Sequence, residues 1–252
     1  MKAIILSAGQ GKRLLPYTAE RPKCIVPIHG RTMVEWQIDE LIKCGVEDIC
    51  VVVGYGADKV EQRLKDRYGQ DGVRILFNPF HSVADNLGTC WIARSEMTED
   101  FILLNGDTLF QAPVLETLLA SEPRPVTVTI DRKNRYDDDD MKVILDGARL
   151  LRIGKDLPLD QVRAESIGML LFRGEGPELF RQAVEDVMRH PAALKRWYLS
   201  VIDELARKTP VWTCCIEGLL WGEVDCPADL KHAAKVVRAI AERQAGAMRG
   251  AV

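Results

Sequence analysis

The chain has 252 residues, of which 47% are hydrophobic and 28% are charged, and its formal net charge is −3. This composition excludes a disordered chain, and the nearly balanced charge argues against a nucleic-acid-binding protein. No apolar run approaches the roughly 20 residues that cross a bilayer, and the cysteines show neither a C-x-x-C pair nor the spacing of zinc ligands. Because the first residues lead into a strand rather than a signal peptide, we expect a reduced, cytoplasmic protein with no nucleic-acid or membrane partner.

The N-terminal segment combines a short apolar run with a loop that contains two glycines. Residues 3–6 have the length and character of a buried strand, and Gly9 and Gly11 let the following backbone turn sharply and approach a ligand closely. Backbone N–H groups in such a loop bind phosphate oxygens, and Lys12 and Arg13 add positive charge. The spacing fits neither the dinucleotide-binding G-x-G-x-x-G motif nor the Walker loop. An ordinary turn between a strand and a helix is the alternative.

This loop resembles a nucleotidyltransferase signature. The pattern Ala8-Gly9-x-Gly11-x-Arg13-Leu14, followed by Pro22-Lys23, is similar to that of the family that joins NTPs to sugar 1-phosphates or other phosphorylated acceptors. The resemblance implies that Arg13 grips the leaving pyrophosphate and that Lys23 neutralises the α-phosphate and the acceptor. The nucleotide-binding residues that it implies are Leu6, Ala8, Gly9, Gly11, Lys12, Arg13, Asp85, Asn86, Gly88 and Gly106.

Strands and helices alternate through the first half of the chain. Helical spacing of apolar residues predicts helices over residues 32–44, 58–68 and 86–95. Apolar runs predict buried strands over residues 49–53, 73–77 and 101–104. This order predicts right-handed strand–helix–strand units and a Rossmann-like α/β fold, in which helices flank a mainly parallel sheet.

Beyond Pro113 the sequence becomes richer in strands. Short alternating runs predict strands over residues 126–130, 142–145, 150–153, 168–172 and 211–216. Helices are predicted over residues 177–188, 192–207 and 228–245. We expect one domain over residues 1–245, made of a nucleotide-binding half (1–112) and an acceptor-binding half (113–245) with a small β-rich elaboration. A frayed tail is expected over residues 246–252.

Two aspartates follow predicted strands. Gly106 and Asp107 come directly after an apolar strand, at the strand end where α/β folds bind ligands, and Gly106 leaves room for a nucleotide. Asp225 follows a short strand and precedes Pro227, which we expect in the first turn of the last helix together with Asp229. The family resemblance implies that Asp107 and Asp225 bind Mg²⁺. Without that resemblance, a helix-start role is the alternative for Asp225, as helix capping is for Asp107.

The stretch from Ala84 to Thr89 is similar to the family segment that lies against the base and the ribose. Asp85, Asn86 and Gly88 offer polar contacts to a nucleoside. Asp85 or Asn86 is equally consistent with an N-cap, and one residue can serve both purposes.

The acceptor side departs from the sugar-1-phosphate members of the family. Those members carry a Glu before the lysine that corresponds to Lys155, where this chain has Gly154, and an acidic residue near the aromatic Trp197-Tyr198. The chain therefore looks more like the phosphocholine-type cytidylyltransferases. The acceptor-binding residues expected on this basis are Lys142, Lys155, Glu165, Trp197 and Tyr198.

Two features of the acceptor side have alternative interpretations. Trp197, Tyr198 and Trp221 are either core residues, which is the commoner role of aromatics in amphipathic surroundings, or a cage that encloses an alkylammonium group by cation–π contact. The acidic run 137–140 is either a flap over the acceptor, with Lys142 and Lys155 turned towards its phosphate, or a solvated loop.

These implications together predict an enzyme, an Mg²⁺-dependent nucleotidyltransferase. We expect it to transfer CMP from CTP to a small phosphorylated acceptor, such as phosphocholine, a phosphonate or inositol phosphate, with Arg13, Lys23, Asp107 and Asp225 as catalytic residues. A cationic acceptor is favoured. The alternatives are a sugar-1-phosphate nucleotidyltransferase that uses UTP, dTTP or GTP, and a catalytically silent relative that binds a nucleotide for regulation. A homodimer is compatible with the sequence.

Overall fold

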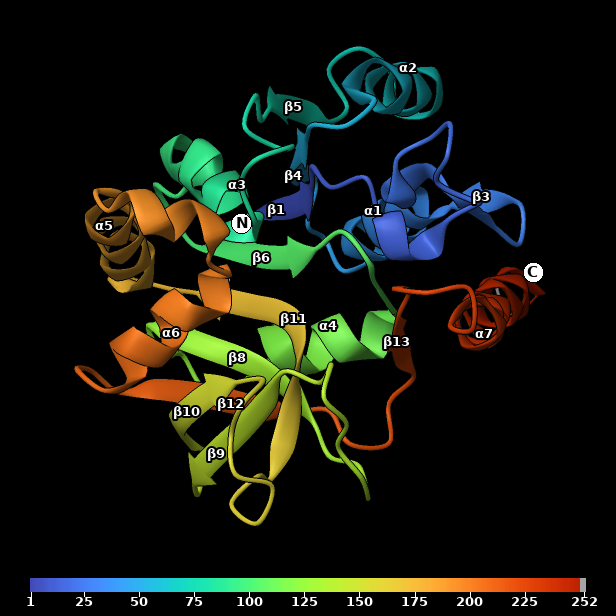
Figure 1. Cartoon of the computed structure of the whole chain (residues 1–252). Coiled ribbons are helices and arrows are strands. Elements are labelled where there is room, and N and C mark those ends of the chain that lie inside the picture. The colour runs from blue at the N-terminus through green and yellow to red at the C-terminus, as the bar shows by residue number, and fades with distance from the viewer. Residues whose placement is uncertain (250–252) are drawn as a thin grey trace.

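A nine-stranded sheet runs through the molecule in the order β5-β4-β1-β6-β11-β8-β12-β10-β9 (Figure 1). The computed structural model describes residues 1–249, with side chains described for residues 1–242. The strands of this sheet are β1 (Lys2–Ser7), β4 (Asp48–Val53), β5 (Arg74–Phe77), β6 (Phe101–Asn105), β8 (Val126–Asp131), β9 (Lys142–Asp146), β10 (Arg149–Gly154), β11 (Ala164–Phe172) and β12 (Val211–Cys215).

The direction of the strands divides the sheet into two parts. Strands β5, β4, β1 and β6 are parallel, whereas β11 pairs antiparallel with β6, with β8 and with β9. In the second part, β12 runs parallel to β8 and antiparallel to β10. The parallel part carries the N-terminal loop, and the strand-rich part forms the lower half of Figure 1.

Helices cover both faces of the sheet. They are α1 (Met33–Lys43), α2 (Ala57–Tyr68), α3 (Asn86–Ile92), α4 (Ala112–Leu119), α5 (Gly176–Met188), α6 (Tyr198–Ala206) and α7 (Leu230–Arg249). Alternating residues of β1 feed two cores: Ile4 packs with α3, α5 and α6, and Ile5 packs with α1, α2 and α4. At the start of α1, the Glu35 carboxylate accepts the Thr32 N–H at 2.6 Å, which caps the helix.

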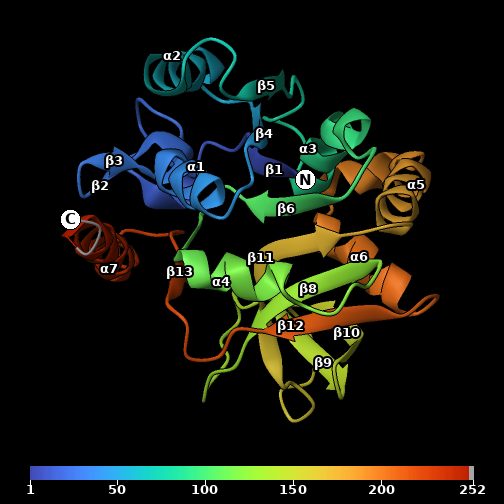
Figure 2. The ribbon, with the colours of Figure 1, turned by 180° about the vertical axis from the view of Figure 1, so that it is seen from behind.

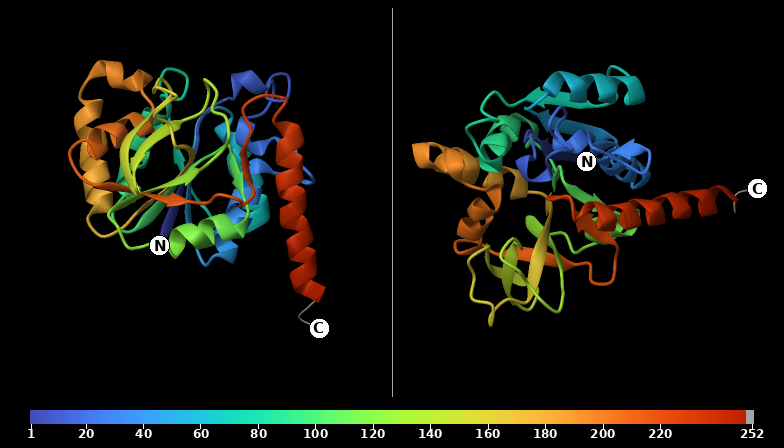
Figure 3. Two further views of the ribbon diagram at one scale, coloured as in Figure 1. Left: turned by 90° about the horizontal axis from the view of Figure 1, so that it is seen from below. Right: turned by 45° about the vertical axis from the view of Figure 1, so that its right-hand side comes forward.

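A third core joins the last helix to two small ladders. Strand β2 (Pro27–Ile28) pairs with β3 (Arg31–Thr32), and β7 (Thr108–Phe110) pairs with β13 (Trp221–Glu223). Val236 and Ile240 of α7 pack in this core with Leu109 of β7 and Ile28 of β2. Figure 2 shows α7 beside β13 from the back, and Figure 3 shows its C-terminal end extending away from the rest of the molecule.

The structure corrects several predicted element boundaries. The helix predicted over residues 192–207 is divided into a 3₁₀ helix (Pro191–Lys195) and α6, because Arg196 and Trp197 are extended. The segment from Arg196 to Tyr198 forms hydrogen bonds with the start of α3 instead. Leu87 N–H donates to the Arg196 carbonyl, and Tyr198 N–H donates to the Asn86 side chain. Helix α3 ends at Ile92 and continues as a 3₁₀ turn (Ala93–Glu96).

The C-terminal region also differs from the prediction. Helix α7 begins at Leu230, so Pro227 lies in the preceding turn rather than in the helix. The Asp229 carboxylate accepts the N–H groups of Asp225 and Cys226, which stabilises that turn. Because α7 continues to Arg249, most of the expected frayed tail is helical, and residues 250–252 lie outside the described residues. Among the described residues, no helix combines the length and the apolar content of a membrane span.

Candidate active site

The N-terminal loop and Asp107 meet at the carboxyl ends of two neighbouring parallel strands. Strand β1 leads into the loop and β6 leads into Gly106 and Asp107. Gly106 N–H donates to the Leu6 carbonyl at 3.0 Å. A Cβ atom at Gly106 would lie 2.3 Å from Ser7 Oγ and 2.6 Å from the Leu6 carbonyl oxygen. Glycine at this position therefore allows the two strand ends to approach each other.

Gly11 allows a second close approach, to Lys23. Its φ of +75° lies in the left-handed region, and a Cβ atom there would lie 2.7 Å from Lys23 Cβ. Lys23 begins a 3₁₀ helix (Lys23–Ile25) that follows the extended Pro22. The loop and this lysine therefore form one packed unit.

Lys23 joins the two predicted carboxylates. Its Nζ lies 2.8 Å from Asp107 Oδ2 and 2.6 Å from Asp225 Oδ1. Asp225 reaches this position because β13 pairs with β7, and Val224 N–H donates to the Asp107 carbonyl at 3.2 Å. Arg13 Nη2 lies 3.1 Å from Asp225 Oδ2 on the other side. The four predicted catalytic residues therefore form one cluster.

Charge pairing keeps Lys23 protonated. Burial opposes its positive charge, but the carboxylates of Asp107 and Asp225 outweigh that effect together, so the pKa of Lys23 lies above its ordinary value. The two carboxylates therefore face a permanent cation at neutral pH.

Glu223 is a site residue that the sequence analysis missed. It is half-buried on β13 opposite Thr108, and Asp225 follows two residues later, just beyond the end of this strand. Burial raises the pKa of Glu223 well above its ordinary value, and the nearby Asp107 and Asp225 carboxylates raise it further. Its place two residues before Asp225 is the signal that would have pointed to it.

Most of the predicted nucleotide-binding residues line one cavity of about 340 Å³, here called the loop cavity. Its lining is Leu6, Ser7, Gly9, Gly11, Arg13, Lys23, Cys24, Asp85, Asn86, Asn105, Gly106, Asp107 and Trp197. Three predicted residues are not part of it. Ala8 is buried with its carbonyl accepting Tyr55 N–H, Gly88 is buried in α3, and Lys12 is exposed. The structure thus corrects the expectation for these three.

Asp85 and Asn86 line the loop cavity at the start of α3. Asp85 occupies the N-cap position, but its side chain makes no capping hydrogen bond. Asn86 Oδ1 accepts Tyr198 N–H at 2.9 Å, which fixes the segment that carries Trp197. Neither side chain caps α3, so the capping alternative does not account for them.

A second cavity of about 620 Å³, here called the acidic cavity, shares Arg13 with the first. Its walls include eight carboxylates: Asp131, Asp137, Asp139, Asp140, Glu165, Glu223, Asp225 and Asp229. Basic groups in the same walls come from Arg13, Lys133 and His232. Because Arg13 lines both cavities and also pairs with Asp225, the two open on the same cluster of catalytic candidates.

The predicted acceptor-binding residues are only partly gathered there. Lys155 Nζ lies 3.0 Å from Asp139 Oδ1 and 4.8 Å from the centre of the Trp197 ring. Lys142 is only 3% exposed and donates to the Lys155 carbonyl at 2.9 Å, so it supports Lys155 from behind instead of turning towards a ligand. Tyr198 has no exposed surface and packs against Phe180 in the core.

The three aromatic residues do not form a cage. Trp197 lines the loop cavity, whereas Trp221 lines the acidic cavity and donates its indole N–H to Asp131 at 2.7 Å. Tyr198 is turned into the core because the chain is extended at Trp197 and enters α6 at Tyr198. For Tyr198, the core alternative describes the structure.

Glu165 lies in the acidic cavity as one of two adjacent carboxylates. Lys133 Nζ lies 2.9 Å from Glu165 Oε2 and 2.7 Å from Asp140 Oδ1. Burial raises the pKa of Glu165 to about 7, against the effect of Lys133 and with the help of the Asp140 charge. Asp140 shows the opposite shift: although burial opposes it, hydrogen bonds from Lys133 and the Asp137 backbone hold its pKa below the ordinary value. The pair thus separates into a stronger and a weaker acid.

The donor set at Asp107 and Asp225 fits Mg²⁺. Within the described residues, no group of three or more His, Cys, Asp and Glu side chains is arranged to hold a metal ion. The two carboxylates nevertheless converge on one cation, and Asp107 Oδ1 is buried without a hydrogen-bond partner. Mg²⁺ prefers oxygen ligands and binds through one or two carboxylates plus water and substrate phosphates. Asp107 and Asp225 would hold it.

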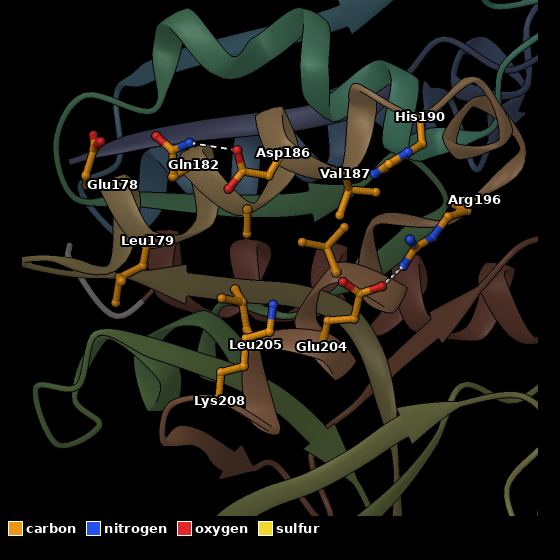
Figure 4. A pocket seen from close by; sticks show the side chains of 12 residues that line it. Glu178, Leu179, Gln182, Asp186, Val187, His190, Arg196, Glu204, Leu205 and Lys208 are labelled. Carbon is orange, nitrogen blue, oxygen red and sulfur yellow. Dashed lines mark hydrogen bonds and ion pairs between the residues drawn. The ribbon is translucent and has the colours of Figure 1, made fainter.

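A third cavity lies between α5 and α6 and is separate from this site (Figure 4). It has a volume of about 630 Å³ and shares no lining residue with the other two. In its wall, Arg196 pairs with Glu204, and Gln182 donates to Asp186. None of the predicted site residues lines it.

Comparison with known proteins identifies related sequences. Residues 3–215 match the MobA-like NTP transferase domain. The chain is 30% identical over 246 residues to the CMP-5′-(3-aminopropyl)phosphonate synthase of Streptomyces rubellomurinus, over 92% of this chain and 38% of that protein. It is 34% identical over 111 residues to the choline-phosphate cytidylyltransferase of Streptococcus pneumoniae, over 44% of this chain and 47% of that protein. The chain thus spans less than half the length of these curated relatives.

Solved structures share the fold. The inositol-1-phosphate CTP transferase of T. maritima superposes with a TM-score of 0.78 over 93% of this chain and 95% of that one, at 20% identity. The CTP:phosphocholine cytidylyltransferase of Streptococcus pneumoniae gives a TM-score of 0.76 over 94% and 98%, also at 20% identity. These superpositions confirm the predicted Rossmann-like α/β fold.

Proposed function

We propose that this chain, which belongs to the MobA-like NTP transferase family, transfers CMP from CTP to a small acceptor that carries a phosphate or phosphonate group. Family membership confirms the predicted resemblance to nucleotidyltransferases. CTP, Mg²⁺ and the acceptor are the finer part of the proposal. The similarity to proteins named as a CMP-phosphonate synthase and a choline-phosphate cytidylyltransferase supports CTP and the acceptor class, and the oxygen donors of Asp107 and Asp225 support Mg²⁺.

One observation carries the proposal: Lys23 lies between Asp107 and Asp225, and Arg13 joins this cluster where the two cavities meet. The loop cavity is lined by glycines and cations, which suits a triphosphate. The acidic cavity opens on the same cluster and provides room for a second substrate. Such an arrangement would bring two phosphorylated molecules together beside the Lys23 ammonium and the Arg13 guanidinium.

The proposed reaction is an in-line displacement at phosphorus. An oxygen of the acceptor phosphate or phosphonate forms a bond to the α-phosphorus, and the bond from that phosphorus to the bridging oxygen of pyrophosphate breaks. Pyrophosphate leaves with the electron pair. Because the attacking oxygen is already ionised near neutral pH, the protein needs no side-chain nucleophile and no strong base.

The protein supplies charge and alignment to this reaction. Lys23, which stays protonated, is placed to neutralise the α-phosphate and the incoming acceptor. Arg13, whose side chain is half-exposed, is placed to hold the leaving pyrophosphate. A bound Mg²⁺ would supply further positive charge to the phosphate oxygens, and Asp107 and Asp225 would hold it.

The acceptor classes that we propose are phosphocholine, a phosphonate or inositol phosphate. Gly154 stands where sugar-1-phosphate relatives carry a Glu for hexose hydroxyls, and the acidic walls of the second cavity favour a cationic group. A sugar 1-phosphate with UTP, dTTP or GTP is the second candidate, and a catalytically silent nucleotide-binding protein is the third. The full set of Arg13, Lys23, Asp107 and Asp225 argues against the third candidate.

A substrate matrix tests the proposal. CTP, UTP, dTTP and GTP are each combined with phosphocholine, a phosphonate, inositol phosphate and several hexose 1-phosphates, and products are identified by mass alongside pyrophosphate release. We expect the highest turnover with CTP and a non-sugar acceptor. Highest turnover with a hexose 1-phosphate would establish the second candidate, and nucleotide binding without any product would establish the third.

A further inference from the structure

The loop 132–141, between β8 and β9, lines the acidic cavity with both signs of charge. Lys133, Asp137, Asp139 and Asp140 of this loop all line that cavity. Asp137 Oδ1 accepts the N–H groups of Asp139 and Asp140, so the loop is held in a defined turn. Its charged side chains can therefore take fixed places in the cavity.

The carboxylate of Asp139 lies between two cations that come from opposite halves of the molecule. Its Oδ2 lies 3.2 Å from Arg13 Nη1, and its Oδ1 lies 3.0 Å from Lys155 Nζ. The Asp139 side chain is 70% exposed, so water screens both pairs and they hold the loop weakly. A phosphate or phosphonate carries more charge and more acceptor oxygens than one carboxylate, and it competes for the same two cations.

The ammonium group of Lys133 is held at a second point of the same cavity. It lies between Asp140 and Glu165, whose side chains are 11% and 8% exposed, and 5.8 Å from the centre of the Tyr136 ring. Carboxylates this far from water need a cation or hydrogen-bond donors. Glu165 belongs to β11 in the central sheet, whereas Lys133 comes from the loop. The fixed part of this ammonium site is therefore Glu165.

We propose that the loop 132–141 occupies the acceptor site as an internal substitute for a zwitterionic acceptor. The carboxylate of Asp139 takes the place of the acceptor's phosphate or phosphonate, at Arg13 and Lys155. The ammonium of Lys133 takes the place of the acceptor's own primary ammonium, at Glu165. This inference rests on the proposed function and narrows its acceptor to an amine-bearing phosphate or phosphonate.

The distances around Lys133 favour a primary over a quaternary ammonium. Both carboxylates lie at hydrogen-bonding distance from its nitrogen, and a trimethylammonium group has no N–H to donate. Cation–π enclosure suits a quaternary group better, but among the described residues the ring recorded beside Lys133 is that of Tyr136 alone, at 5.8 Å. An amine-bearing phosphonate therefore fits this site better than phosphocholine does.

Binding calorimetry tests the inference without relying on turnover. The probes are 2-aminoethylphosphonate, ethylphosphonate, which lacks the amine, and phosphocholine, each titrated in the presence of Mg²⁺ and a non-hydrolysable CTP analogue. We expect the amine to improve affinity by about tenfold or more over ethylphosphonate. Glu165→Gln should remove that difference, measured as the ratio of the two affinities in the same variant.

The loop itself is tested at Asp139. Asp139→Asn removes the competing charge, so both phosphonates should bind several-fold more tightly, and Asp138→Asn in the same loop is the matched control. Equal affinity for the two phosphonates, tighter binding of phosphocholine, no binding of either phosphonate, or weaker binding after Asp139→Asn would each overturn the inference. Unfolding midpoints check that each variant is folded.

Turnover separates this inference from the proposed function. If the amine discrimination and its loss in Glu165→Gln are observed but no acceptor receives CMP, the proposed function fails and the ammonium site stands. If CMP is transferred to acceptors with and without an amine at equal KM, the proposed function stands and this inference fails.

Discussion

In the nucleotide half, Gly11 and Gly106 let backbone segments touch, so Lys23 and Asp107 are placed by packing. In the acceptor half, Lys155, Asp139 and Lys133 are placed by ion pairs within and across a loop. Packing gives one arrangement, whereas ion pairs can exchange partners, and the exposed pairs of Asp139 do so at little cost. The difference suits a protein that holds its triphosphate in a fixed frame and admits its second substrate by exchange of charges.

The largest expected effect concerns Asp107 and Asp225, the two carboxylates that contact Lys23. Asp107→Asn or Asp225→Asn should lower kcat by about 10³-fold, because each removes a carboxylate that would hold Mg²⁺ at the reacting phosphates. Lys23 keeps one carboxylate partner in either variant, so the fold should persist. Pyrophosphate release at saturating substrates measures the effect, with Asp138→Asn as the control. A kcat close to that of the unaltered protein in both variants would remove these residues from the proposed mechanism.

A substitution at Gly106 tests how closely the ends of β1 and β6 are packed together. Gly106→Ala should lower the free energy of unfolding by about 1–3 kcal/mol, because the new Cβ atom would meet Ser7 Oγ and the Leu6 carbonyl. Gly9→Ala is the matched control, since nothing lies within 4 Å of a Cβ atom there. Urea titration of both variants gives the comparison. Equal stability of the two would show that the strand ends are not closely packed.

The separation of the two halves is tested at Arg13 and Lys155. Lys155→Ala should raise the KM of the acceptor about tenfold and leave the KM of CTP unchanged, since it deletes one charged contact. Arg13→Ala should raise the KM of CTP and that of the acceptor by similar factors, because Arg13 lines both cavities. Steady-state kinetics with each substrate varied in turn measures both. If Lys155→Ala changed the KM of both substrates equally, the halves would not act separately.

The smallest effect is a pH dependence of acceptor binding. Burial raises the pKa of Glu165 to about 7, and the groups that face it are Lys133 and Asp140. Above that pKa the group is a carboxylate and attracts an ammonium, and below it this attraction is lost. The KM of an amine-bearing acceptor should therefore fall several-fold from pH 6 to pH 8. Glu165→Gln with the same acceptor should lack that component, while the acceptor's own titration appears in both profiles.

The clustering of the proposed catalytic residues could be predicted from the sequence because three of them follow rules of backbone geometry. Loops after parallel strands meet at one edge of the sheet, which places Arg13, Lys23 and Asp107 together. Asp225 needed the family resemblance, because the β7–β13 ladder that brings it there consists of two three-residue strands with little sequence signal. Helix α4, which lies between β7 and β8 in the chain, was not predicted for a similar reason, since it has only eight residues.

The acceptor side was less predictable because side-chain direction decides it. Tyr198 and Trp197 are neighbours, yet one is in the core and the other lines a cavity, since the chain changes from extended to helical between them. The β9–β10 hairpin pairs Lys142 with Gly154, which brings the Lys142 ammonium to the carbonyl of the next residue, Lys155. A pattern of residue types in the sequence does not predict the direction in which each of these side chains points.

The β7–β13 ladder has a consequence for the biosynthesis of the protein. Lys23 and Asp107 are made early and can fold with β1 and β6, but their partner Asp225 is translated more than a hundred residues after Asp107. Until β13 returns to β7, the nascent chain has a phosphate loop and only one of its two carboxylates. Under the proposed function, a polypeptide still emerging from the ribosome lacks Asp225 and should not transfer CMP until β13 has paired with β7.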